Sequence, residues 1–275
     1  MNDLALMHEA VKLARLAGEA ILPFWRTGVA VTSKADDSPV TAADLAAHRV
    51  IDDGLRALAP HIPVLSEEAC DIALAERQAW TRWWLVDPLD GTKEFIAGSE
   101  EFTVNIALIE RGEVVFGVVA MPTNGRCYFG GGALGAWRAE AGGEAGPIQV
   151  RDAPPAGGCF TVVASRRHSS QQQEALLAGL KVQVGDLELA NIGSSLKFCL
   201  LAEGSADCYP RLAPTSQWDT AAAQGVLEGA GGEVIEVGGQ PFRYPHRESL
   251  LNPFFLALPK AAVWRDAFLQ AHIHH

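Results

Sequence analysis

Two carboxylates flank a proline turn in the segment Trp84–Phe95, which reads Trp-Leu-Val-Asp-Pro-Leu-Asp-Gly-Thr-Lys-Glu-Phe. An apolar strand would end there in Asp87 and Asp90. Carboxylates held on a rigid turn can share a hard cation, and the proline-fixed backbone exposes the Leu89 carbonyl as a further oxygen ligand. The segment therefore predicts a site for divalent metal ions, of which magnesium best suits such oxygen ligands.

The same segment offers backbone donors for a phosphate. The amides of Gly91 and Thr92 lie at an expected helix start, where they have no intrahelical acceptor. Glu67 follows an apolar run elsewhere in the chain, and Asp219 begins a glycine-ended helix. Each of these acids alone is usually a solvated loop residue or a helix cap. Together with the proline turn they form a more unusual set of acids than any one of them alone.

Hydrophobic periodicity predicts the elements that would position these residues. Apolar residues recur at helical spacing over Leu4–Phe24, and Thr41 is an N-cap candidate for a helix over Ala42–Leu58, with Asp44 in its first turn. Further helices are expected at Gln171–Leu180, Ser194–Ala202 and Thr220–Ala230. Strands are expected at Trp83–Val86, Phe160–Ala164, Lys181–Val184, Val234–Val237 and Phe254–Leu258, with hairpins joining Thr103–Ile109 to Val114–Ala120 and Cys127–Phe129 to Ala136–Trp137.

A Gly- and Pro-rich stretch from Ala141 to Gly158 is the best candidate for a domain boundary. We therefore expect an N-terminal α+β part, 1–155, that carries the metal-binding motifs. A C-terminal α/β part, 156–275, would carry the substrate-recognition residues and Asp219.

The acidic composition excludes two classes of partner. The 275 residues carry a formal net charge of -11, whereas duplex nucleic acid and anionic membrane surfaces both require clustered Lys and Arg. No apolar run is long enough for a transmembrane segment, and the N-terminus lacks the pattern of a signal peptide. These features predict a cytoplasmic enzyme and leave open a peripheral association with the inner membrane. Five scattered cysteines without a Cys-x-x-Cys pair predict reduced thiols.

Two other motifs are set aside. The run Gly130–Gly135 matches the glycine fingerprint of dinucleotide-binding folds, but the residues that follow it predict a returning strand rather than a helix, so a hairpin turn is expected. His168 could serve Ser165 as a base, yet no nucleophile-elbow motif surrounds any serine.

Several motifs together resemble the inositol monophosphatase superfamily of lithium-sensitive, magnesium-dependent phosphatases. Within it, the chain is most similar to the CysQ-type 3′(2′),5′-bisphosphate nucleotidases. The resemblance covers the chain from the first helix to about Leu258 and rests on the segments Trp84–Phe95, Ser33–Asp44, Val64–Glu68, Phe102–Ala107 and Ile192–Cys199.

The resemblance implies a fold, a metal set and a catalytic pair. The fold is an α/β (α+β) layered αβαβα sandwich of the inositol monophosphatase and fructose-1,6-bisphosphatase type, with the active site in a cleft. Two or three Mg²⁺ ions would be held by Glu67, Asp87, the Leu89 carbonyl, Asp90 and Asp219. Asp44 and Thr92, together with Glu67, would form the catalytic set, in which the Thr92 hydroxyl relays a proton of the attacking water to Asp44.

Substrate recognition is also carried over from the resembled nucleotidases. Ser165, His168, Gly193 and Lys197 would contact the nucleotide, next to the metal-site residues Glu67, Leu89, Asp90, Gly91, Thr92 and Asp219. Exposed turn residues and an ordinary helix cap remain an alternative for the first four.

The implied reaction converts adenosine 3′,5′-bisphosphate (PAP) to AMP and phosphate during sulfate assimilation, and the sulfated nucleotide PAPS stays open as a second substrate. An inositol or sugar phosphatase on the same scaffold is the nearest alternative, and a non-catalytic nucleotide sensor is the alternative from another class. The sequence does not separate a monomer from a homodimer.

Overall fold

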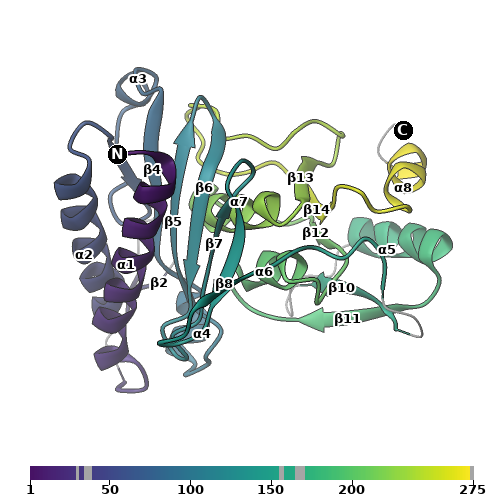
Figure 1. The fold of residues 1–275 in the computed structure, drawn as a ribbon, viewed down its shortest axis with the longest axis horizontal. Helices are drawn as coiled ribbons and strands as arrows, with labels where there is room; N and C mark the ends of the chain where they lie inside the picture. Colours follow the sequence, from purple (N-terminus) through teal and green to yellow (C-terminus); the bar gives the residue numbers. More distant parts are fainter. Residues whose placement is uncertain (29–30, 34–38, 155–157, 165–170, 273–275) are drawn as a thin grey trace.

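The molecule is built from alternating layers of helix and sheet (Figure 1). The structure, a computed structural model, describes residues 1–28, 31–33, 39–154, 158–164 and 171–272. Ser165 and His168 of the predicted substrate site lie outside the described residues. Helices α1 and α2 form the first outer layer, a large sheet follows, α6 and α7 form the middle layer, and a smaller sheet is covered by α5 and α8. This layering confirms the predicted αβαβα sandwich.

The two helices of the first layer begin at the predicted positions. Helix α1 (Asp3–Ile21) starts after Asn2, whose side chain accepts a hydrogen bond from the Ala5 amide. The expected helical pattern up to Phe24 ends in a short 3-10 turn, Leu22–Phe24, because Pro23 has no amide hydrogen to donate. Helix α2 (Ala42–Leu58) has the predicted N-cap at Thr41. No helix in the described part of the chain is both long and apolar enough to span a bilayer.

The large sheet is antiparallel except at one edge. Its order is β3-β4-β5-β6-β7-β8-β9, and only the β3–β4 pair is parallel. The strands are β3 (Val64–Ser66), β4 (Arg82–Asp90), β5 (Thr103–Glu110), β6 (Glu113–Ala120), β7 (Cys127–Gly131), β8 (Gly135–Ala139) and β9 (Ala145–Pro147). Both predicted hairpins are confirmed, including the β7–β8 turn at the glycine run. Short elements flank this sheet: β1 (Val31–Ser33), β2 (Pro39–Thr41), α3 (Leu74–Arg77) and α4 (Thr92–Ile96).

The middle layer packs against the large sheet through glycine. Helix α7 (Ala221–Gly229) crosses β6 and β7, and helix α6 (Leu196–Ala202) lies beside it. A Cβ atom on Gly117 of β6 would lie 1.8 Å from the carbonyl oxygen of Ala222, and one on Gly225 would lie 2.5 Å from the Gly117 amide. Helix and sheet backbones therefore approach more closely than any side chain would permit.

The smaller sheet has the order β12-β14-β13, and the parallel pair β10–β11 is attached to it by a bridge between Val162 and Cys208. Its elements are β10 (Phe160–Ala164), β11 (Leu187–Asn191), β12 (Tyr209–Arg211), β13 (Gly232–Glu236) and β14 (Phe255–Pro259). Helices α5 (Gln171–Val184) and α8 (Arg265–His272) cover it. Leu180 of α5 and Phe268 of α8 share an apolar core with Phe160, Val162 and Leu256.

One predicted strand is wrong. Residues Lys181–Val184 continue helix α5, and the strand that pairs with β10 is β11, a few residues later. Polar and apolar residues alternate in this segment, but it does not form a buried sheet face, because Val182 is 82% exposed. Nothing in the segment stops the helix until Gly185, which adopts a φ of +85° and can end it.

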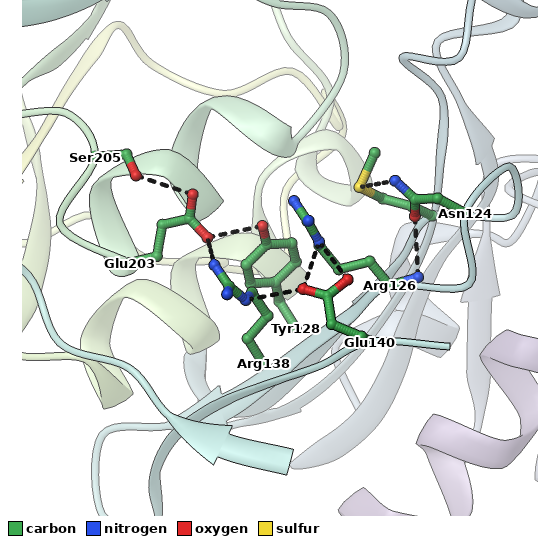
Figure 2. A network of polar contacts seen from close by, with 8 residues as sticks. Asn124, Arg126, Tyr128, Arg138, Glu140, Glu203 and Ser205 are labelled. Atoms are coloured by element: carbon green, nitrogen blue, oxygen red, sulfur yellow. Dashed lines mark hydrogen bonds and ion pairs between the residues drawn. The ribbon is translucent and has the colours of Figure 1, made fainter. Parts of the chain in front are cut away.

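A polar network fixes the C-terminal end of α6 to the large sheet (Figure 2). Glu203, directly after α6, accepts hydrogen bonds from the Tyr128 hydroxyl at 2.9 Å and from Arg138 Nη1 at 2.8 Å. Glu140 in turn accepts from Arg126 Nε at 3.1 Å and forms an ion pair with Arg138. Tyr128 is buried on β7, so the network joins helix and sheet at a buried end, while Arg138 and Glu140 extend it to the partly exposed surface.

Replacing Gly117 with alanine should destabilise the protein by about 3 kcal/mol, because the new methyl group must push α7 away from the sheet. Chemical unfolding followed by tryptophan fluorescence measures the effect. Gly146→Ala is the matched control, since a Cβ at that strand residue has no atom within 4 Å. Equal stability of the two variants would refute the close-packing interpretation.

Candidate active site

The proline turn at the end of β4 directs two carboxylates away from the regular strand. The β4–β5 register pairs Asp87 with Asn105 and Asp90 with Thr103, and it shifts between these two pairs. Such a bulge changes the direction in which side chains project. Asp87 Oδ1 accepts the Leu89 amide at 3.0 Å, which fixes the turn from inside.

A third carboxylate reaches this turn from the middle layer. Asp219 ends the 3-10 helix η2 (Gln217–Asp219) directly before α7, and its Oδ2 accepts the Ser216 amide at 2.8 Å. Asp87, Asp90 and Asp219 each offer a carboxylate oxygen within 4.8 Å of the others. The structure thus brings together three acids from two distant segments of the chain, as the sequence predicts.

Glu67 approaches the same cluster from the neighbouring strand. It follows β3, which runs parallel to β4, and its amide donates to the Val86 carbonyl at 3.0 Å. Its carboxylate contacts that of Asp87 closely enough to contribute to the raised pKa of Asp87. Glu67 therefore lies beside Asp87, next to the cluster that Asp87, Asp90 and Asp219 form within 4.8 Å.

Burial and mutual repulsion disfavour the ionised forms of these acids. The pKa of Asp87 is raised by burial and by the charges of Glu67, Asp90 and Asp219. Burial, with the charge of Asp90, raises the pKa of Asp219 to about 8. Burial also raises the pKa of Asp90, although Lys197, the Ser195 amide and Asn105 oppose this shift. A divalent cation would neutralise the repulsion, and hard oxygen donors are the ligands that Mg²⁺ prefers, so the donor set fits this metal.

The predicted catalytic pair, Asp44 and Thr92, lies next to the turn. The Thr92 hydroxyl is 3.3 Å from Asp44 Oδ1 and 3.3 Å from the Leu89 carbonyl oxygen. Asp44 is buried, and its other oxygen, Oδ2, accepts the Thr41 amide at 2.7 Å and the Thr41 hydroxyl at 2.6 Å. The capping box of α2 therefore occupies one oxygen of Asp44 and leaves the other facing Thr92. Gly91, with a φ of +92°, precedes Thr92 as the N-cap of α4.

The described half of the predicted substrate site is a strained turn before α6. Ser194 has a φ of +48°, which is unusual for a residue with a Cβ. The Gly193 amide donates to Glu101 Oε2 at 2.7 Å, and Lys197 Nζ donates to the Ser194 carbonyl at 2.9 Å. Lys197 is only 7% exposed, so its ammonium lies within the protein beside the acidic cluster rather than extending into solvent.

A cavity of about 220 Å³ joins the acidic cluster to this turn. The residues around it include the predicted Asp90, Gly91, Gly193, Lys197 and Asp219, and several that sequence reasoning missed: Lys93, Glu94, Glu101, Ser194, Ser195, Tyr209, Arg211 and Thr215. Arg211 carries no motif that would identify it in the sequence. Its guanidinium is held by the carbonyls of Ala213 and Pro214 at 3.2 and 3.1 Å.

Two of the site residues that were not predicted lie beneath the cavity, and their positions in the sequence could have identified them. Thr103 and Asn105 are polar residues two apart in a strand whose other residues up to Ile109 are apolar, so they share one face of β5, and both are fully buried. Buried polar side chains need partners. Here the partners are Asp90 and Ser195, the latter from a segment that no local pattern links to β5.

Comparison with known proteins shows that the similarity extends over nearly the whole chain. The 3′(2′),5′-bisphosphate nucleotidase CysQ of Shigella flexneri is 50% identical over 252 residues, which cover 91% of this chain and 98% of that protein. The protein of the same name from Aggregatibacter actinomycetemcomitans is 36% identical over 265 residues, covering 96% of each chain.

Solved structures show the same likeness. CysQ from Bacteroides thetaiotaomicron, described as a bacterial member of the inositol monophosphatase family, superimposes with a TM-score of 0.81 at 40% identity, covering 93% of this chain and 97% of that one. The suhB protein of Bartonella henselae shares the fold at 23% identity, with a TM-score of 0.77 and coverage of 98% of this chain and 99% of its own. The sequence pattern of the inositol monophosphatase family matches residues 3–266. The chain therefore belongs to the inositol monophosphatase family.

Proposed function

We propose that this protein is a Mg²⁺-dependent 3′(2′),5′-bisphosphate nucleotidase that hydrolyses PAP to AMP and phosphate, with PAPS as a second substrate, in sulfur metabolism. The observation that carries the proposal is the meeting of Asp87, Asp90 and Asp219 within 4.8 Å at one end of a cavity whose lining includes Lys197 and Arg211. The carboxylates would attract metal cations, and Lys197 and Arg211 would attract the phosphates of the nucleotide. The relatives named as bisphosphate nucleotidases at 50% and 36% identity support the choice of substrate.

The metal ions would be held by Glu67, Asp87, Asp90 and Asp219, with the Leu89 carbonyl as a further oxygen ligand. Bound divalent ions neutralise phosphate oxygens, lower the pKa of a bound water and support the leaving oxygen. The described cluster contains neither His nor Cys, which favours Mg²⁺ over softer metals. We propose two or three ions in the active complex.

The chain itself would move the proton of the attacking water. Thr92 would accept that proton while its own hydroxyl hydrogen passes to Asp44 Oδ1, which is 3.3 Å away. The second oxygen of Asp44 is held by Thr41, so the acceptor is fixed in position. A fixed carboxylate within reach of a hydroxyl is the geometry that general-base catalysis requires.

Recognition of a second phosphate would distinguish a nucleotide from an inositol or sugar monophosphate. Arg211, Lys93 and Lys197 line the cavity together with four acids, of which Asp90 and Asp219 belong to the metal cluster; the other two are Glu94 and Glu101. Cations gathered at this place in an acidic protein are suited to a ligand with a second anionic group. We propose that Gly193, Lys197 and Arg211 form the described part of the nucleotide site and that Ser165 and His168 complete it.

Substrate preference and metal dependence test the proposal directly. Phosphate release should be fastest with PAP, much slower with inositol monophosphate and fructose bisphosphate, abolished by EDTA and inhibited by lithium. Asp87→Asn should lower kcat/KM for PAP by about three orders of magnitude, because several kcal/mol of charge stabilisation depend on the metal site. Asp53→Asn, a change at an exposed acid of α2, is the matched control and should retain full activity. A metal-independent rate or a preference for inositol monophosphate would overturn the assignment.

The relay is tested by removing only the Thr92 hydroxyl. Thr92→Val should lower kcat for PAP about 100-fold with little change in KM, since a positioned proton acceptor contributes to the transition state. Thr92→Ser keeps the hydroxyl and should retain most of the rate. Steady-state kinetics of both variants decides the point, and equal loss in the two would contradict a role for the hydroxyl.

The acidic cluster also predicts how stability depends on pH. The pKa of Asp219 is about 8 in the fold and 3.8 for an ordinary aspartate, so the folded protein holds a proton that the unfolded chain releases between these values. Without metal, the free energy of unfolding should therefore fall as the pH rises from about 4 to about 8. Bound metal replaces those protons, so Mg²⁺ should raise the Tm more at pH 8 than at pH 6.

Thermal melts in EDTA and in excess Mg²⁺ measure both effects. Asp219→Asn should flatten the pH dependence of the Tm in EDTA, because the substituted side chain does not titrate. A wild-type profile that matches the variant's at every pH would show that Asp219 is not the titrating group.

A further inference from the structure

A closed set of hydrogen bonds surrounds one oxygen of Asp90. Oδ2 accepts the Ser195 amide at 2.6 Å and Asn105 Nδ2 at 3.3 Å, and the Thr103 hydroxyl lies 3.5 Å from it. The Ser195 hydroxyl donates to Asn105 Oδ1 at 2.9 Å and lies 2.9 Å from the Thr103 hydroxyl. These four residues come from the β4 turn, from β5 and from the start of α6.

The direction of each hydrogen bond follows from the number of available protons. The single proton of the Ser195 hydroxyl is donated to Asn105 Oδ1, so Thr103 must be the donor to the Ser195 oxygen. The Asn105 amide is then fixed in one orientation, with its oxygen toward Ser195 and its nitrogen toward Asp90. Each polar group has one role, and the chain of donors ends at Asp90 Oδ2.

Burial makes this arrangement restrictive. Thr103 and Asn105 are fully buried, and Ser195 is 2% exposed. Polar groups at such depth lose free energy unless they are paired, and here they are paired with one another and with Asp90. The carboxylate of Asp90 is therefore fixed in rotation, with Oδ2 occupied by the Ser195 amide and the Asn105 side chain, and Oδ1 is the oxygen that these donors leave open.

We propose that Asn105, Ser195 and Thr103 are positioning residues that aim Asp90 Oδ1 at the metal ions, so that metal affinity depends on them although none of them is a metal ligand. The inference rests on the proposed function, because it takes Asp90 as a ligand. Hydrogen-bonding partners that orient a metal ligand raise metal affinity by restricting that ligand to its binding geometry.

The proposal predicts an order of metal affinities. Asn105→Ala removes the amide donor to Asp90 and should weaken binding of Mn²⁺, used as a probe for Mg²⁺, by about 10- to 100-fold. Ser195→Ala keeps the backbone donor and removes only the hydroxyl that orients Asn105, so its effect should be smaller, about 5-fold. Ser195→Ala still tests the proposal if Asn105→Ala does not fold.

Tyr128→Phe is the matched control. It removes one partly buried hydrogen bond at the opposite end of α6, where the Tyr128 hydroxyl donates to Glu203 (Figure 2). We expect Tyr128→Phe to bind Mn²⁺ with the wild-type affinity. If Asn105→Ala or Ser195→Ala only loosened α6, its Mn²⁺ affinity would also equal that of the wild type. Thermal unfolding of each protein in EDTA shows how much general stability each substitution removes.

Isothermal titration with Mn²⁺ in the absence of nucleotide gives the affinities without reference to turnover, and the Mg²⁺ concentration for half-maximal rate should shift in the same order. Wild-type affinity in both Asn105→Ala and Ser195→Ala, or equal losses in these variants and Tyr128→Phe, would overturn the positioning role while leaving the proposed function intact. Failure of the wild type to bind Mn²⁺ or Mg²⁺ would instead overturn the proposed function and this inference with it.

Discussion

The constraint on which the structure depends is the crowding of like charges. Asp87, Asp90 and Asp219 hold carboxylate oxygens within 4.8 Å of one another, and Glu67 adds a further charge against Asp87. Such a cluster is unfavourable without bound cations, so the fold must hold each acid in place independently. It does so with one backbone amide for each of the three aspartates, from Leu89 for Asp87, Ser195 for Asp90 and Ser216 for Asp219.

The packing of α6 and α7 against the large sheet holds these acids in fixed positions. Asp219 belongs to the segment that starts α7, and α7 is seated on the large sheet by the contact between Gly117 and Gly225. Asp90 is joined to α6, whose far end is fixed to β7 and β8 through Glu203. The distance between acids from opposite sides of the cleft is thus set by backbone packing and buried polar contacts, which resist the repulsion better than flexible side chains would.

The parts of the molecule that could be predicted are those governed by local sequence. The proline turn, the Thr41 cap with Asp44 and both hairpins depend on residues close together in the chain, and each was found where the pattern indicated. The strand at Lys181–Val184 was wrong because a short alternating run fits an exposed helix end equally well. The Asp90–Ser195 and Glu101–Gly193 contacts join residues 105 and 92 positions apart. The local sequence around these residues does not indicate which distant residue each one contacts.

Lys197 shows how tertiary structure changes the significance of a residue found by motif. In the sequence it is a donor at a helix start that could extend toward a nucleotide, whereas in the fold it is almost fully buried beside Asp90. Burial lowers the pKa of Lys197, while the charges of Asp90, Glu94 and Asp219 raise it. Its ammonium therefore offsets part of the negative charge of the cluster from within the protein. A cleft balanced in this way can accept cations at the carboxylates and a phosphate at their side, which a site made only of acids would repel.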